Sequence, residues 1–192
     1  QIPFPLEEVS WDYQIVGRNQ ELEFEILIAA IKNELLDQQY ENFNRISVEP
    51  VIFDVGSLST YNALFNGHIK PEEKVIILDI GFSPTTMIIH QPEGYWVRTL
   101  SFSSYAITQT LMQEFNISYE EAESLKYKGF ILSDSMAAKN EEDVNYKINS
   151  IITQHAKKLY MEITRSLTFY KTQFSDIEID RIILCGGGCR LD

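Results

Sequence analysis

Residues 75–90 read VIILDIGFSPTTMIIH, and this stretch decides the interpretation of the fold. Two apolar runs are separated by Asp79, Gly81 and a short polar segment. This pattern predicts a buried strand, a tight turn and a second strand. Because glycine reaches positive φ and lets backbone N–H groups approach an anion, the turn suits a phosphate group accompanied by magnesium.

A second glycine turn follows another short apolar run, in the stretch RIILCGGGCRL at residues 181–191. Gly186, Gly187 and Gly188 carry no side chains, so a flat or bulky ligand such as a nucleoside could rest against their backbone. Taken alone, either motif is also typical of an ordinary turn or loop. Their joint presence, each after a buried strand, favours a ligand site.

The residues around these turns are assigned roles on chemical grounds. Asp79 is predicted to orient a water bound to magnesium, because Mg²⁺ prefers oxygen ligands and keeps several waters. Backbone amides of the first turn and a hydroxyl would bind the phosphates. The predicted cofactor-binding residues are Asp79, Gly81, Phe82, Ser83, Thr85, Gly186, Gly187 and Gly188, with Asp79 also the candidate catalytic and metal-associated residue.

Composition restricts the class of protein. The 192 residues carry a formal net charge of −12 and only 16 scattered basic residues, which argues against nucleic-acid binding. Two cysteines, Cys185 and Cys189, are too few for a disulfide framework and favour a reducing compartment, so we expect a cytoplasmic protein. No run approaches the roughly 20 apolar residues of a membrane helix, which argues against direct insertion. The start at Gln1 predicts a fragment of a longer protein.

Residues 1–70 are predicted to form a small α+β unit. The alternating runs 11–17 and 21–29 predict an antiparallel ribbon with one wet face, on which glutamates lie opposite the apolar side chains of Leu22, Phe24, Ile26 and Ile28. We then expect a helix over about 31–43, a strand over 46–55, and a helix from an N-cap at Ser57 to about Phe65.

Residues 71–192 are predicted to form a second unit. The runs 75–81, 85–91 and 95–102 predict a three-stranded meander, followed by helical spacing over 104–127 with a capping box at Ser118 and Glu121. Residues 132–143 are predicted to form a surface loop. A long apolar stripe from about Glu141 to Phe174 predicts a single helix, and a last strand leads into Gly186–Gly188. The fold class is therefore mixed α/β.

The residues quoted above resemble a known superfamily. VIILDIGFSPTTMII is similar to the second phosphate motif, and IILCGGGCRL to the adenosine motif, of the actin-like ATPase (ribonuclease H-like) fold. The order of IPFPLEEVSWDYQIVG, EPVIFDV, LDIG, RTLSF, EITRSLTFYKTQF and GGGCRL resembles the family of type IV pilus assembly proteins called PilM, which is related to the division protein FtsA. The resemblance covers nearly the whole chain.

The resemblance implies a partial actin-like fold. Residues 1–70 would be the small inserted subdomain typical of FtsA and PilM with the return to the first lobe, and 71–192 the second lobe. The first phosphate hairpin of such proteins would precede Gln1. Two departures stand out: Pro84 removes one backbone donor from the phosphate turn, and Ser103-Ser104 replaces two glycines usual at a helix start.

The resemblance also implies a function. We expect a cytoplasmic, ATP- and magnesium-binding scaffold of the type IV pilus platform, at most a slow ATPase, that binds the cytoplasmic tail of an inner-membrane PilN-like partner and other platform proteins. It would thus be peripheral to the inner membrane. The alternatives are a small-molecule kinase of the same fold, and a structural relative with a vestigial nucleotide site.

Overall fold

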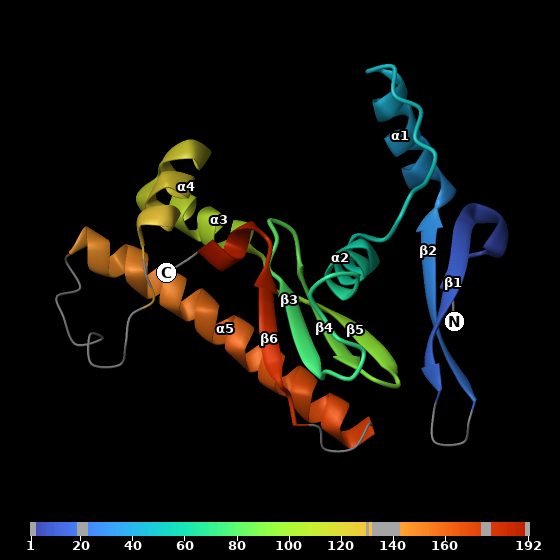
Figure 1. The fold of residues 1–192 in the computed structure, drawn as a ribbon. Helices are drawn as coiled ribbons and strands as arrows, with labels where there is room; N and C mark the ends of the chain where they lie inside the picture. Colours follow the sequence, from blue (N-terminus) through green and yellow to red (C-terminus); the bar gives the residue numbers. More distant parts are fainter. Residues whose placement is uncertain (1–2, 19–22, 130, 132–142, 174–177, 191–192) are drawn as a thin grey trace. The chain divides into compact units, whose positions relative to one another are not determined.

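The computed structural model describes residues 3–18, 23–129, 131, 143–173 and 178–190. The chain divides into two compact units, one made of Gln1–Pro71 with Gln91–Trp96 and the other of Glu72–His90 with Val97–Asp192. Figure 1 shows the order of helices and strands along the chain.

The first unit contains a two-stranded ribbon and two helices (Figure 1). Strands β1 and β2 pair antiparallel, with Trp11 opposite Ala30 and Ile15 opposite Ile26, which confirms the expected ribbon. A short 3₁₀ turn precedes β1. The elements are η1 (Leu6–Glu8), β1 (Val9–Arg18), β2 (Phe24–Lys32), α1 (Asn33–Asn44) and α2 (Gly56–Phe65).

The exposure of the ribbon is the reverse of what the sequence predicts. Phe24, Ile26 and Ile28 do share one side, but they are 58%, 51% and 40% exposed. The alternate residues Glu25 and Leu27 are only half-buried. Alternation identifies which residues share a face, but does not say which face another element will cover. Leu22 lies outside the described residues.

Two further expectations in the first unit are wrong. Residues 46–55 form no strand, and Val51 and Ile52 are 91% and 82% exposed. Within the described residues this segment pairs with no other strand, so its apolar side chains have no sheet to join. Helix α2 begins at Gly56 without a side-chain N-cap; Ser57 lies inside it, and Asp54 instead accepts hydrogen bonds from the Val55 amide and the Ser59 hydroxyl.

The second unit is built on a four-stranded sheet with the order β5-β4-β3-β6. The meander is confirmed: β3 and β4 are antiparallel, and β3 also pairs with β6, which runs parallel to it. The strands of this sheet are β3 (Val75–Asp79), β4 (Thr85–Gln91), β5 (Gly94–Leu100) and β6 (Arg181–Cys185), with the turn between β4 and β5 assigned to the first unit as Gln91–Trp96.

The core of this unit explains why the sequence of β3 is a continuous apolar run. All four residues from Val75 to Leu78 are buried, because both faces of β3 are covered. A strand buried on both faces reads as a continuous apolar run rather than an alternating one. The other buried side chains of the unit include Met87, Ile88 and Ile89 of the neighbouring strand β4, together with Ile107, Leu111 and Ile152 of the helices.

Within the described residues, the second unit also contains the α-helices α3 (Ser104–Phe115), α4 (Tyr119–Lys128) and α5 (Val144–Gln173) and the short 3₁₀ helix η3 (Gly187–Arg190). The capping box of Ser118 and Glu121 is present as predicted. Helix α5 has 30 residues, so it is about 45 Å long, and it extends beside the sheet in Figure 1. Its Glu162 accepts a hydrogen bond from the Ser101 amide at 2.7 Å. Glu141, Glu142 and Phe174, and most of the predicted surface loop, lie outside the described residues.

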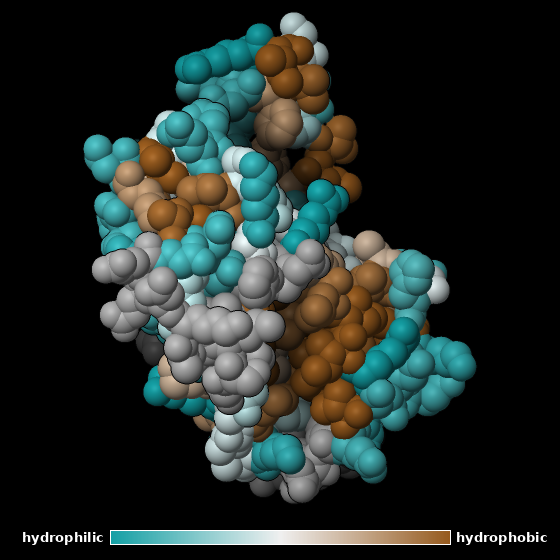
Figure 2. Space-filling model, turned by 90° about the vertical axis from the view of Figure 1, so that its left-hand side faces the viewer, coloured by the Kyte–Doolittle hydropathy of each residue, from teal (hydrophilic) through white to brown (hydrophobic). Residues whose placement is uncertain are grey.

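Large hydrophobic side chains are also exposed at the surface, in broad areas of the space-filling view (Figure 2). In the second unit they include Ile182 and Leu184 of the edge strand β6, which are 57% and 54% exposed. Among the described residues, no helix is both long enough and apolar enough to cross a membrane.

Candidate nucleotide site

The two glycine turns follow neighbouring parallel strands. Asp79, the last residue of β3, lies opposite Cys185, the last residue of β6. Because the strands are parallel and in register, both turns leave the sheet at the same edge. The Ile80 amide donates to the Cys185 carbonyl at 2.9 Å, and the Gly188 amide donates to the Ile80 carbonyl at 2.7 Å. The structure therefore brings Asp79 and Gly186–Gly188 together, as the sequence predicts.

The first turn is anchored through its carbonyl groups. The Ser104 amide donates to the Gly81 carbonyl at 3.1 Å, and the Tyr105 amide donates to the Phe82 carbonyl at 3.4 Å. In the described part of the chain, the amides of Gly81, Phe82 and Ser83 donate to no backbone carbonyl. The carbonyl groups of the turn thus bind the first amides of α3, whereas its three amide N–H groups make no backbone hydrogen bond with the described residues. An anion binds to such N–H groups.

Gly81 does not adopt the left-handed conformation that the sequence suggested. Positive φ among the glycines of the described residues occurs at Gly94 and Gly186. A Cβ added to Gly81 would lie 3.6 Å from the Ser83 carbonyl oxygen, an ordinary contact distance. Since the turn is held by its carbonyl bonds to α3, it does not need a residue without a side chain at position 81.

Phe82 and Thr85 lie in contrasting surroundings. The Phe82 ring is 54% exposed and packs against Tyr105, with 4.6 Å between ring centroids. Thr85 is fully buried, and its hydroxyl has no hydrogen-bond partner among the described residues. The Thr85 amide donates to the Phe102 carbonyl at 2.7 Å. The neighbouring Pro84, which has no N–H group, therefore does not disturb this hydrogen bond. The buried hydroxyl is a polar group that a bound ligand or water would satisfy.

The three glycines of the second turn are not equivalent. Gly186 has φ +83°, and a Cβ there would lie 2.4 Å from the Ile80 carbonyl oxygen and 2.7 Å from the Asp79 Oδ1. A Cβ at Gly188 would lie 2.5 Å from the Ile80 Cγ2. A Cβ at Gly187 would meet nothing within 4 Å. Gly186 and Gly188 are therefore needed for packing, and Gly187 is the one that borders open space.

The start of α3 lies against the second turn. A Cβ at Gly188 would approach the Ser104 Cβ to 3.1 Å. Ser103 is the N-cap of α3, and its side chain accepts a hydrogen bond from the Ala106 amide at 3.3 Å. The pair of serines that replaces two glycines thus supplies a normal helix start.

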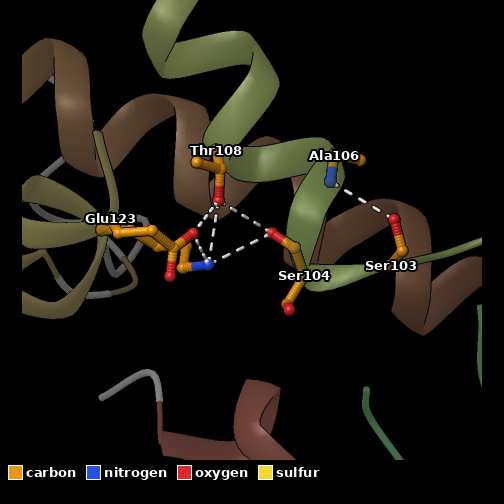
Figure 3. Close-up of polar contacts among 6 residues, drawn as sticks. Ser103, Ser104, Ala106, Thr108 and Glu123 are labelled. Atoms are coloured by element: carbon orange, nitrogen blue, oxygen red, sulfur yellow. Dashed lines mark hydrogen bonds and ion pairs between the residues drawn. The ribbon is translucent and has the colours of Figure 1, made fainter. Parts of the chain in front are cut away.

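A buried polar cluster lies next to this helix start and was not recognised from the sequence (Figure 3). Lys126 is 2% exposed; its Nζ donates to Thr108 Oγ1 at 2.9 Å and forms an ion pair with Glu123 at 2.5 Å. The Thr108 hydroxyl also contacts Glu123. Lys126 Nζ reaches the Ser104 carbonyl at 3.5 Å, so the cluster joins the start of α3 to α4.

A sequence signal for this cluster does exist. Ala122 and Lys126, four residues apart, are the two buried residues of α4, so Lys126 occupies the apolar face of the helix. A lysine on that face with a glutamate three residues before it indicates a buried ion pair.

Cys185 is a thiol held within the site. It is half-buried, and burial raises its pKa to about 11, with the negative charges of Asp79 and Cys189 adding to the effect. The thiolate is the reactive form, so this environment makes Cys185 a poor nucleophile near neutral pH.

We expect alkylation to distinguish the two cysteines. A shift of the thiol pKa from 9.0 to about 11 lowers the thiolate fraction below pH 9 about 100-fold. Iodoacetamide at pH 8 should therefore modify Cys189 first, and Cys185 should react only as the pH rises toward 11. Mass spectrometry of timed samples measures both rates; equal rates at pH 8 would contradict the assignment.

Metal binding at the site would depend on groups beyond the side chains. Within the described residues, no cluster of three or more His, Cys, Asp or Glu side chains is arranged to hold a metal ion. Since Asp79 belongs to no such cluster, a magnesium ion there would take most of its ligands from water and phosphate oxygens, as this ion commonly does.

Comparisons with solved structures identify the fold. The chain is similar to a structure described as a PilM-PilN type IV pilus biogenesis complex, with 24% identity and a TM-score of 0.76 over 98% of this chain and 52% of that one. It is also similar to MreB5 of Spiroplasma citri bound to ADP, with 12% identity and a TM-score of 0.52 over 96% of this chain and 78% of that one. An archaeal actin homolog, Ta0583, in complex with ADP gives 11% identity and a TM-score of 0.52 over 85% and 49%.

These similarities confirm the expected actin-like fold, and this chain spans about half the length of the PilM chain that it matches. The family model described as type IV pilus assembly protein PilM matches residues 1–192. The chain therefore belongs to the PilM family of type IV pilus assembly proteins.

Proposed function

We propose that this chain is part of a nucleotide-binding scaffold of the type IV pilus inner-membrane platform, which binds the cytoplasmic tail of a PilN-like partner. Family membership and the similarity to a structure of PilM with PilN support the pilus role and the partner. The protein would be cytoplasmic and peripheral to the inner membrane through that partner. Contacts with other platform proteins belong to the same proposal.

One observation carries the nucleotide part of the proposal. The turn after β3 presents the amides of Gly81, Phe82 and Ser83, and it is hydrogen-bonded directly to the turn that contains Gly187. Donors for an anion and an open stretch of backbone thus lie side by side. This arrangement suits the phosphates and the nucleoside of one ligand.

The residues present fit ATP with magnesium. The amides of the first turn would bind phosphate oxygens, Asp79 would orient a water on the metal, and Gly187 would face the nucleoside. Magnesium would neutralise part of the triphosphate charge. The buried Thr85 hydroxyl would bind the ligand only after a local opening, since it is fully covered here.

Hydrolysis is expected to be slow at most. The exposed side chain of Phe82 in the phosphate turn is apolar, so it can neither hold an attacking water nor accept its proton. This ring and the buried Thr85 also favour the second candidate, a structural relative with a vestigial site. ATP consumption stimulated by a small-molecule substrate would instead indicate the kinase alternative.

Two substitutions in the intact protein test the site. Gly187→Val should fold normally and weaken binding of a fluorescent ATP analogue at least tenfold, with or without magnesium, because its side chain enters open space. Asp79→Ala should weaken binding only when magnesium is present. Tenfold corresponds to about 1.4 kcal/mol. Fluorescence anisotropy measures both affinities.

Gly67→Val is the matched control, because a Cβ at Gly67 also meets nothing within 4 Å and this glycine lies in the first unit. It should bind the analogue like the parent. Equal affinity in all three variants would refute the site. Absence of binding by the parent would favour the vestigial candidate, whereas retained binding of a PilN tail peptide would leave the scaffold role standing.

A further inference from the structure

The charge of helix α5 is opposite to that of the rest of the chain. Of its 30 residues, five are basic and only Glu162 is acidic. The other residues of the chain include 27 acidic and 11 basic ones. Glu162 accepts the Ser101 amide and is half-buried, so it does not contribute to the solvent face of the helix.

The basic residues of α5 are interleaved with exposed apolar side chains. Lys157, Met161, Arg165 and Phe169 are spaced four residues apart and are all exposed, Met161 and Phe169 each to 48%. Residues at this spacing form one ridge along a helix. The ridge, here called the α5 ridge, therefore alternates a cation with an apolar side chain over about 18 Å.

Residues beside the α5 ridge have the same character. Tyr160 is 70% exposed, and Lys158 and Lys171 are also exposed. The opposite side carries Ile152, Ser166 and Tyr170, which are buried in the second unit. The solvent face of α5 is thus cationic and partly apolar.

We propose that the α5 ridge binds an acidic amphipathic helix of a protein partner. Such a helix, with acidic and apolar residues alternating at four-residue spacing, would place a carboxylate against each cation and an apolar side chain against Met161 or Phe169. Helix-in-groove recognition uses the same spacing of anchors.

A membrane surface fits the ridge less well. A helix that lies in a bilayer interface needs a continuous apolar face, whereas a cation separates Met161 from Phe169 on this ridge. The buried side of α5 is occupied by the core of its own unit. An anionic bilayer would also repel the strongly acidic remainder of the chain.

The test uses the intact protein and a defined probe. The probe is a fluorescein-labelled helical peptide of about 20 residues with glutamate and leucine alternating every four residues on one face, and a second peptide has glutamine in place of glutamate. We expect the acidic peptide to bind at least tenfold more tightly than the glutamine peptide, with an affinity that falls as salt rises. The double variant Lys157→Glu/Arg165→Glu should lose this binding at least tenfold.

The matched control, Arg98→Glu/Lys128→Glu, makes the same charge change at exposed positions of β5 and α4 and should bind like the parent. Circular dichroism and thermal unfolding show whether each variant folds. Equal binding of the acidic peptide by both double variants would overturn the proposal. So would binding of phosphatidylglycerol vesicles in place of the peptide, or self-association of the protein that the ridge variant abolishes.

Discussion

Glu123→Ala is expected to lower the free energy of unfolding by about 3 kcal/mol, because it leaves the buried ammonium of Lys126 without its counter-ion. Lys126 would keep its bond to Thr108, so the loss lies at the lower end for a broken buried pair. Thermal or urea unfolding of the intact protein measures the change. Since the cluster supports the start of α3, nucleotide binding should weaken in the same variant.

Two companion variants separate the charge effect from a general effect on α4. Glu120→Ala removes an exposed glutamate from the same helix and should change stability by less than about 0.5 kcal/mol. Glu123→Leu/Lys126→Met removes both charges together and should recover most of the lost stability. If the single and double variants are equally unstable, the ion pair is not the cause.

Gly186→Ala is expected to destabilise the second unit by about 3 kcal/mol or more. Its φ of +83° disfavours any side chain, and the new Cβ would lie 2.4 Å from a backbone oxygen that cannot easily move. To relieve this clash, the end of β6 would have to move away from the end of β3. Both the unfolding midpoint and nucleotide affinity should fall.

Gly81→Ala and Gly187→Ala are the controls for this effect, since a Cβ at either position has space. Both should unfold within about 1 kcal/mol of the parent. A Gly81→Ala variant as unstable as Gly186→Ala would show that the first turn requires the conformational freedom that the sequence suggested and the structure does not use.

Much of the second unit could be predicted from its sequence. The apolar run of Val75–Leu78 predicts a buried strand, and Ser118 with Glu121 predicts a helix start. Both depend on local sequence alone, and the structure confirms both. A joint site at the two glycine turns was expected because each turn follows a short buried strand, and the parallel pairing of β3 with β6 is what places Asp79 and Gly186 side by side. The actin-like fold and the PilM family were expected from the order of the motifs.

The remaining features depend on contacts that local patterns do not contain. Residues 46–55 have strand composition, but a strand needs a partner, and none is present among the described residues. The exposed side of Phe24 and Ile26 depends on which face of the ribbon is covered. The different roles of Gly186 and Gly187 depend on the position of Ile80, far away in sequence.

The parallel pairing of β3 with β6 has a consequence for how the molecule is made. Leu78 and Cys185 are 107 residues apart, so the last strand can dock only after the whole intervening chain has been synthesised and a large loop has closed. A nascent or partly folded chain therefore has the first turn but not the second. The two turns of the candidate site therefore come together only when β6 pairs with β3, so the complete site cannot form before this long-range contact.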